Sequence, residues 1–172
     1  MASIIKANEL QDFGGNSIIT SDGAGNVTVN AAAMKNTPSF SVQLSSVQSI
    51  ANNTNVVIIF DQKNYDTDNA YNTSTGEFTV PSGKGGKYFF TSHFRLDSTT
   101  DSSRLAMNIQ VNGVAKAIYN NVQRDEDSCG VSLVIDLNAG DQVKAVTFQN
   151  TGAAKNSKTE GNVMFMGYKL IT

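Results

Sequence analysis

Two neighbouring stretches, GEFTVP at residues 76–81 and GKYFFTSHF at residues 86–94, decide the fold class. The first reads as a turn glycine, a short strand and a proline that stops it, and the second as a glycine followed by a long aromatic strand. Side chains alternate between the two faces of a strand. One face of this strand therefore carries Tyr88, Phe90, Ser92 and Phe94, and the other carries Phe89, Thr91, His93 and Arg95. Large residues on both faces indicate an all-β fold in which each face is covered.

The chain from Pro38 onward repeats this pattern of short alternating segments separated by turn residues. Residues 56–60 differ, because they form a continuous apolar run of the kind found in a strand buried on both sides. We expect strands at residues 39–44, 56–60, 77–80, 87–96, 104–111, 114–120, 131–137, 142–149 and 163–171. Nine or ten strands with turn signals between them favour a β-sandwich or jelly roll.

Residues 1–37 differ in composition from the rest and are expected to form an N-terminal arm, with the head domain at residues 38–172. The turn dipeptide Asp22–Gly23 lies between predicted strands at residues 17–20 and 27–30, which predicts a β-hairpin. A lone hairpin is marginally stable in water, so the arm either stays flexible or docks on something else. The apolar residues available for docking are Ile4, Ile5, Leu10, Phe13, Ile18, Ile19, Val27 and Val29.

Charge and cysteine content exclude several classes of function. The chain is 16% charged with a net charge of -2 and a pI near 5.3, and it has no basic stripe of the kind that binds nucleic acid. Its single cysteine, Cys129, cannot form an intramolecular disulfide. The N-terminus has no secretion-signal pattern, and the longest apolar run, residues 56–60, is far shorter than a membrane span. We therefore expect a cytoplasmically made protein with no nucleic-acid partner and no membrane insertion.

The order of motifs after Pro38 resembles the globular head of complement component 1q. The motifs are the two opening stretches, VNG at 111–113, SCG at 128–130, LNAGDQV at 137–143 and FMGY at 165–168. The resemblance covers residues 38–172 and implies a tumour-necrosis-factor-like jelly roll of ten strands that assembles as a trimer and carries no active site. It also implies that sister copies cover the second apolar face, although a loop is an alternative cover. The trimer-interface residues would be Phe89, Thr91, His93, Met164, Met166 and Tyr168.

The arm supports a second resemblance. The chain has no collagen-like Gly-x-y repeat, and its segments 3–6, 10–12 and 16–28 resemble the start of small virion proteins from tailed phages. This implies a phage virion protein at the particle surface, made in the host cytoplasm, most simply a capsid decoration or cement protein whose arm binds the major capsid protein or another virion protein. The alternative is a short tail fibre or receptor-binding module that recognises host surface glycans through loops at residues 64–75, 98–103, 120–128 and 151–161.

Evidence for chemistry is sparse. His93 and Cys129 would have to form a catalytic dyad, but no Gly-x-Ser-x-Gly elbow or third partner accompanies them, so we do not expect an enzyme. Residues 66–69, DTDN, resemble the start of a calcium loop, with Asp66 and Asp68 as ligands. The EF-hand pattern fails at Ala70 and Tyr71, and the same aspartates also make ordinary turns. Calcium is therefore a hypothesis, and we expect no other cofactor.

Overall fold

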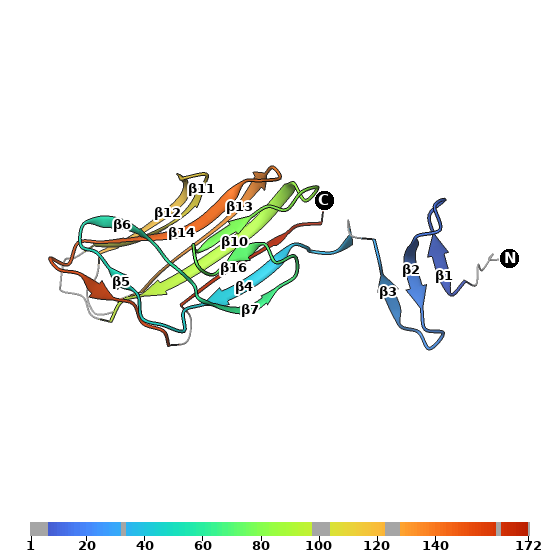
Figure 1. Ribbon diagram of the computed structural model, residues 1–172, viewed down its shortest axis with the longest axis horizontal. Coiled ribbons are helices and arrows are strands. Elements are labelled where there is room, and N and C mark those ends of the chain that lie inside the picture. Colours follow the sequence, from blue (N-terminus) through green and yellow to red (C-terminus); the bar gives the residue numbers. More distant parts are fainter. Residues whose placement is uncertain (1–6, 32–33, 98–103, 123–127, 161–162, 172) are drawn as a thin grey trace.

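Two five-stranded antiparallel sheets face each other and form the head in the computed structural model, which describes residues 7–31, 34–97, 104–122, 128–160 and 163–171 (Figure 1). The first sheet runs in the order β13 (Ser128–Leu137), β10 (Gly86–Arg95), β16 (Met164–Lys169), β4 (Ser39–Gln43) and β7 (Gln62–Asp66). The second runs in the order β12 (Val114–Val122), β11 (Arg104–Val111), β14 (Gln142–Gln149), β9 (Glu77–Thr79) and β8 (Tyr71–Asn72). The all-β prediction is confirmed.

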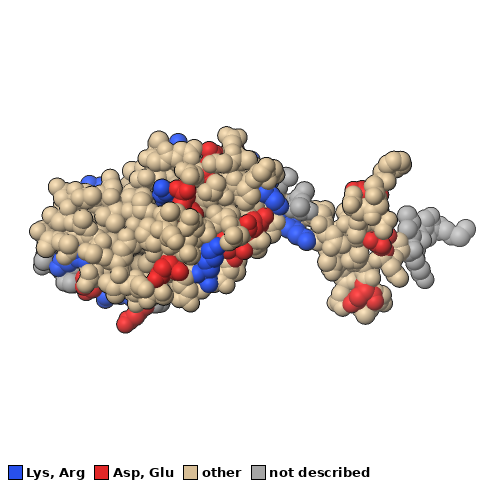
Figure 2. Space-filling view, in the orientation of Figure 1, with Lys and Arg blue, Asp and Glu red and all other residues tan. Residues whose placement is uncertain are grey.

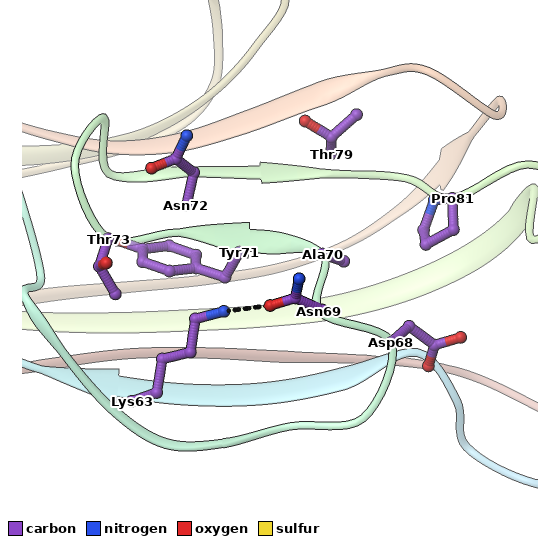
Figure 3. Close-up of a pocket in the computed structure, with 9 residues that line it drawn as sticks. All are labelled: Lys63, Asp68, Asn69, Ala70, Tyr71, Asn72, Thr73, Thr79 and Pro81. Atoms are coloured by element: carbon purple, nitrogen blue, oxygen red, sulfur yellow. Dashed lines mark hydrogen bonds between the residues drawn. The ribbon is translucent and has the colours of Figure 1, made fainter.

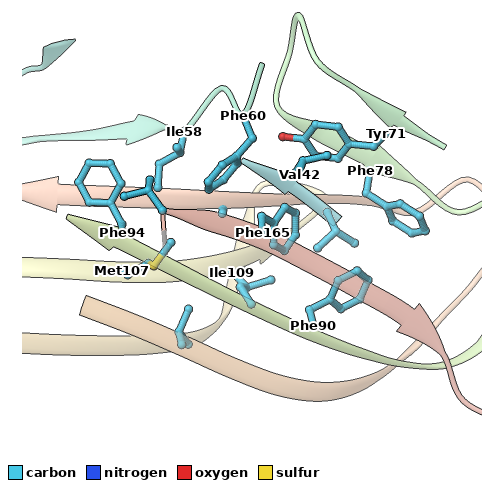
Figure 4. Packing of buried hydrophobic residues seen from close by; sticks show 14 of the residues in the cluster. Val42, Ile58, Phe60, Tyr71, Phe78, Phe90, Phe94, Met107, Ile109 and Phe165 are labelled. Carbon is cyan, nitrogen blue, oxygen red and sulfur yellow. The ribbon is translucent and has the colours of Figure 1, made fainter. Parts of the chain in front are cut away.

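Aromatic rings from both sheets fill the space between them (Figure 4). Phe40 of β4 stacks on Phe78 of β9 with a centroid distance of 4.9 Å, and it meets the edge of Phe165 of β16 at 5.0 Å. Phe90 of β10 lies edge-on to Phe78 at 5.7 Å. Such pairs add about 0.5–1.5 kcal/mol each beyond the area they bury, so they hold the two sheets in one relative position.

Gly167 of β16 provides the space for this cluster. It lies directly opposite Phe90 on one side and Phe40 on the other in the strand pairing. A Cβ at this position would overlap the Phe90 ring and lie only 3.0 Å from Cε1 of Phe40. Both rings are fully buried, and neither can move without disturbing its neighbours.

The expected strand at residues 56–60 is wrong in its bounds. The strand β6 covers Thr54–Val57 and lies beside β14, and it ends before the buried residues Ile58 and Phe60. The Gln48 side chain takes the place of a neighbouring strand here, because its Nε2 donates to the Val57 carbonyl at 2.7 Å and its Oε1 accepts from the Ile59 amide at 2.9 Å. The prediction of a run buried on both sides is also wrong, because only Ile58 and Phe60 are buried and the other three residues are half-buried. On the other side of the run, the Ile58 amide still donates to the Ala145 carbonyl of β14 at 3.0 Å. Nearby, β5 (Ser49–Ile50) pairs with β15 (Lys155–Asn156).

The arm forms a sheet of its own that stands beside the head in Figure 1. The predicted hairpin is present as β2 (Ser17–Ser21) and β3 (Val27–Val29). A third strand, β1 (Glu9–Gln11), adds to the other edge of β2 and was not predicted, because three residues with one apolar side chain give no periodic signal. The hairpin turn is closed by Asp22, whose Oδ1 accepts from the Ala24 and Asn26 amides.

We expect Gly167→Ala to lower the free energy of unfolding by about 1–3 kcal/mol, the usual cost of forcing an extra carbon into a packed core. Urea denaturation followed by circular dichroism measures the change. Gly14→Ala is the matched control, because its added Cβ would meet only the side chains of Asp12 and Asn16 in an exposed turn. The control should change stability by less than about 0.5 kcal/mol. Equal stability of the two variants would contradict the packing role of Gly167.

Candidate subunit interface

The six residues predicted for the trimer interface lie together on the outer face of the first sheet. The pairing of β10 with β16 places Phe89 opposite Tyr168, Thr91 opposite Met166 and His93 opposite Met164. Directly opposite residues point to the same face, and the alternate residues of both strands fill the core. All six side chains are half-buried in the single chain. The structure therefore brings them into one patch of three cross-strand pairs.

Two further residues extend this patch and were not predicted. Val134 of β13 lies opposite Phe89 and is 58% exposed, and Tyr65 of β7 lies opposite Ser41 and is 49% exposed. The alternation of residues 131–137 contained the signal for Val134, which falls on the face opposite to Leu133. No such signal exists for Tyr65, because the sequence around its strand β7 has the composition of a loop. The patch thus spans the full width of the sheet, from β13 to β7.

The polar groups on this face are satisfied within the chain. Thr91 Oγ1 and Ser132 Oγ lie 2.9 Å apart, and the Asn64 side-chain amide donates to Ser41 Oγ at 3.2 Å. The rings of Phe89 and Tyr168 contact each other at a centroid distance of 5.4 Å. Because these hydroxyls already have partners, another protein surface can cover the face without leaving them unpaired. The patch is therefore suited to burial.

His93 and Cys129 do not form a dyad. Cys129 lies opposite Phe94 in the pairing of β10 with β13, so it faces the core, whereas His93 points to the outer face beside Gly130. Burial raises the pKa of the Cys129 thiol to about 12, which leaves little thiolate at neutral pH. The two side chains are thus on opposite faces of the sheet, and the thiol is not a nucleophile in this environment.

A cavity of about 540 Å³ lies near β7 and β8, and one of the two candidate calcium ligands is part of its lining (Figure 3). Asp68 lines the cavity, and its carboxylate is 3.8 Å from the Lys84 ammonium. Asp66 is almost fully buried, and its carboxylate accepts from Lys63 Nζ at 2.8 Å and from the Ala70 and Tyr71 amides at 3.0 Å. Lysine ammonium groups thus lie where the hypothesis would place a cation. In the ranges that the structure describes, no three acidic, histidine or cysteine side chains gather into a metal site.

Hydrogen bonding sets the charge state of Asp66. Burial alone would raise its pKa, but the Lys63 ammonium and the amides of Tyr71 and Ala70 outweigh burial and hold the pKa below the ordinary value of 3.8. The carboxylate therefore stays ionised and closes the loop between β7 and β8. This local network explains the DTDN sequence as a structural turn.

The arm collects four of the predicted docking residues on one face. The pairing of β1, β2 and β3 places Leu10, Ile19 and Val29 in one cross-strand row, and Val27 shares their face. Leu10 is 55% and Val27 is 62% exposed. Ile18 points to the opposite face and Phe13 is fully exposed in the turn after β1, while Ile4 and Ile5 lie outside the described residues. The arm sheet thus has one apolar face.

Charged groups of both signs are scattered over the visible surface, most of which is uncharged (Figure 2). Within the described ranges, no helix has the length and hydropathy that crossing a bilayer requires.

The fold and the patch together define a jelly-roll head domain with one apolar outer sheet face. The model of the C1q domain matches residues 39–170, so the chain belongs to the C1q domain family. The predicted family and jelly-roll fold are confirmed. A search of curated proteins found no match.

Three solved structures show the same fold. The globular domain of zebrafish complement 1qA is 19% identical, with a TM-score of 0.56 over 77% of this chain and 97% of that one. The PRD1 vertex protein P5 is 15% identical, with a TM-score of 0.59 over 77% and 96%. Murine APRIL at pH 8.5 is 14% identical, with a TM-score of 0.54 over 77% and 98%. At these identities the likeness concerns the fold alone.

We expect Asp66→Asn to destabilise the head by about 1–3 kcal/mol at pH 7, since it weakens charge-assisted hydrogen bonds to a buried group. Folding lowers the pKa of Asp66, so the unfolded chain binds the proton more readily. The stabilisation is therefore complete above about pH 5 and is lost as the pH falls through the lowered pKa of the folded state. Urea denaturation should show a gap between wild type and variant that narrows from pH 7 to about pH 3.

Asp68→Asn is the control, because its ion pair is longer and partly exposed and should contribute less than about 1 kcal/mol. A stability gap for Asp66→Asn that is absent at pH 7, or that is the same at both pH values, would contradict the role given to this carboxylate.

Proposed function

We propose that the protein is a structural protein of a phage particle: a trimeric jelly-roll knob on the virion surface that decorates the capsid and is anchored by its N-terminal arm. The observation that carries this proposal is the first sheet with two apolar faces, one packed on the core and one open in the single chain. An open apolar face of this width favours a subunit interface over a free surface. No catalytic role is included, since His93 and Cys129 are apart.

A threefold ring requires two different patches on each copy, because its interfaces are head-to-tail. The outer face of the first sheet is one patch. The edge where β12 and β13 approach each other supplies the second, since Tyr119 lies opposite the core residue Met107 and is nevertheless 46% exposed. Three copies would each place this edge on the neighbour's Phe89–Tyr168 face. The trimer implied by the resemblance to the complement 1q head, whose family this chain belongs to, supports this arrangement.

The arm supports attachment to a particle. Its sheet is too small for a core of its own, yet it presents one face with Leu10, Ile19, Val27 and Val29. Such a sheet gains stability by laying this face on another protein or by adding its edge to a neighbouring sheet. The partner we propose is the major capsid protein or another virion protein. Three arms on one trimer would multiply a weak contact through effective concentration. PRD1 P5 is a vertex protein, and a place of that kind on a particle would suit this chain.

A receptor-binding module is the second candidate, and a specific feature favours it. The outer face of the second sheet carries a pocket with both polar and apolar lining residues, and neither the Phe89–Tyr168 face nor the arm face includes it. A knob on a particle surface would direct such a pocket outward, toward host glycans. The two roles are compatible, because they involve different surfaces of the same chain.

We expect the wild-type protein to sediment at about three times the 18.4 kDa of one chain at micromolar concentration. Thr91→Arg should shift it to single chains, because it would bury a charge at the centre of the interface without a partner. Thr73→Arg, in the loop beside β8, is the matched control and should leave the trimer intact. A wild-type protein that sediments as a monomer would refute the proposed assembly.

We expect deletion of residues 1–37 to abolish binding to particles that lack this protein, while the remaining chain still forms trimers. Leu10→Asp combined with Val29→Asp should weaken binding at least tenfold, because both changes put charge on the apolar arm face. Thr20→Asp combined with Thr28→Asp is the control, since these residues share the opposite face of the same three-stranded sheet. Co-sedimentation with particles measures all three. Retained binding by the Leu10/Val29 variant, or equal losses in both variants, would count against docking through this face.

A further inference from the structure

A second cavity, of about 270 Å³, lies on the outer face of the second sheet. Its floor is the outward row Ala106, Asn108 and Gln110 of β11. Phe148 of β14 borders it on one side, opposite Ala106, and Ile118 of β12 borders it on the other, opposite Asn108. The small side chain of Ala106 leaves the hollow between these larger neighbours. Because the floor and both walls are built on paired strands, the cavity has a rigid frame.

Asn108 is the unusual residue of this floor. Asparagine is depleted in strands, yet this one lies between the core residues Met107 and Ile109 and points outward. Its side chain is only 6% exposed, and its Oδ1 is fully covered with no donor among the residues that the structure describes. Buried acceptors are paired in nearly all folded proteins, so this oxygen calls for an explanation. Rotation of the Asn108 side-chain amide by half a turn exchanges the positions of its oxygen and nitrogen, so either atom can contact a ligand in the cavity.

The rim of the cavity is nearly neutral. Arg104 is its only charged residue among those described, and the guanidinium is already engaged: it lies over the Phe148 ring at 5.0 Å, and its Nε donates to Asn120 Oδ1 at 3.0 Å. The other polar lining groups are the amides of Asn55, Asn108 and Gln110. Without a carboxylate in the described lining, the site offers little to a cation.

We infer that this cavity binds one pyranose ring, as found at the end of a glycan. A hydroxyl group donates and accepts, and so does a side-chain amide, so neighbouring ring hydroxyls match Asn108 and Gln110 on the floor. The carbon-bound face of the ring would lie on the apolar wall of Ala115 and Ile118. Ligand pockets usually measure about 300–1,000 Å³, so this smaller cavity takes a single ring rather than a longer saccharide.

This inference rests on the receptor-binding role proposed above and does not depend on attachment to a particle. The cavity opens on the outer face of the second sheet, whereas the proposed subunit interface uses the outer face of the first sheet and the edge at Tyr119, which points to the other side of β12. The arm is a different part of the chain. The proposals of sugar binding and of particle attachment can therefore be tested, and refuted, independently of each other.

The test is nuclear magnetic resonance on the full-length, isotope-labelled protein with a panel of neutral methyl pyranosides at millimolar concentration. We expect at least one of them to shift the backbone signals of residues 106–110 and 115–118 and the side-chain amide signal of Asn108. Linear polyols form a second arm, and they should produce no saturable shift. No response to any pyranoside, or an equal response to the linear polyols, would overturn the inference.

Two variants locate the site. Ala115→Phe fills the cavity from an exposed position on β12 and should weaken pyranoside binding at least tenfold. Ala139→Phe makes the same change in an exposed turn away from the cavity and should bind like the wild type. Both should sediment like the wild type, which separates a filled pocket from a damaged fold. Undiminished binding by Ala115→Phe would show that the sugar binds elsewhere.

Discussion

The packing of aromatic rings between the two sheets is the constraint on which the rest of the structure depends. Phe40 and Phe90 of the first sheet meet Phe78 of the second, Phe165 packs against Phe40 and Phe90, and Gly167 leaves the room for them. Once these rings face inward, the side chains between them must face outward, because a strand has only two faces. A slip of one residue would exchange the two sets. The outer patch is therefore a direct consequence of the core.

The two outer faces differ in a way that bears on function. The first sheet presents aromatic and methionine side chains whose neighbouring hydroxyls are already paired, as between Thr91 and Ser132. The second presents a hollow with a buried, unpaired amide oxygen at Asn108, among the residues that the structure describes. Exposing the hollow on the second sheet to water is less unfavourable than exposing the apolar outer face of the first sheet. If sister copies cover the first sheet and the second faces solvent, the apolar face is buried and the hollow stays open.

Predictions from local sequence patterns were correct where neighbouring residues determine the structure. They were wrong where residues distant in the sequence make the contacts. The alternation of residues 87–96 correctly separated the core residue Phe90 from the outward Phe89. The apolar run 56–60 was predicted as a strand buried on both sides, but only Ile58 and Phe60 are buried, and the distant side chain of Gln48 hydrogen-bonds to its backbone. The DTDN stretch resembled a calcium loop because the sequence shows its aspartates but does not show which groups hydrogen-bond to them. Asp66 in fact holds the Lys63 ammonium and two backbone amides.

The amino-acid sequence by itself determined the strand class and the two faces of each long strand, because the two-residue period and the turn residues act over neighbouring positions. The family was identified separately, from the resemblance of its motifs in order. Only the tertiary structure decided which strands lie side by side. It placed Val134 and Tyr168 on either side of Phe89, and it placed Asn108 between Ile118 and Val146 with no donor for its oxygen in the described part of the chain. These neighbours come from distant parts of the chain, and their meeting depends on the pairing of the whole sheet, which no local pattern encodes.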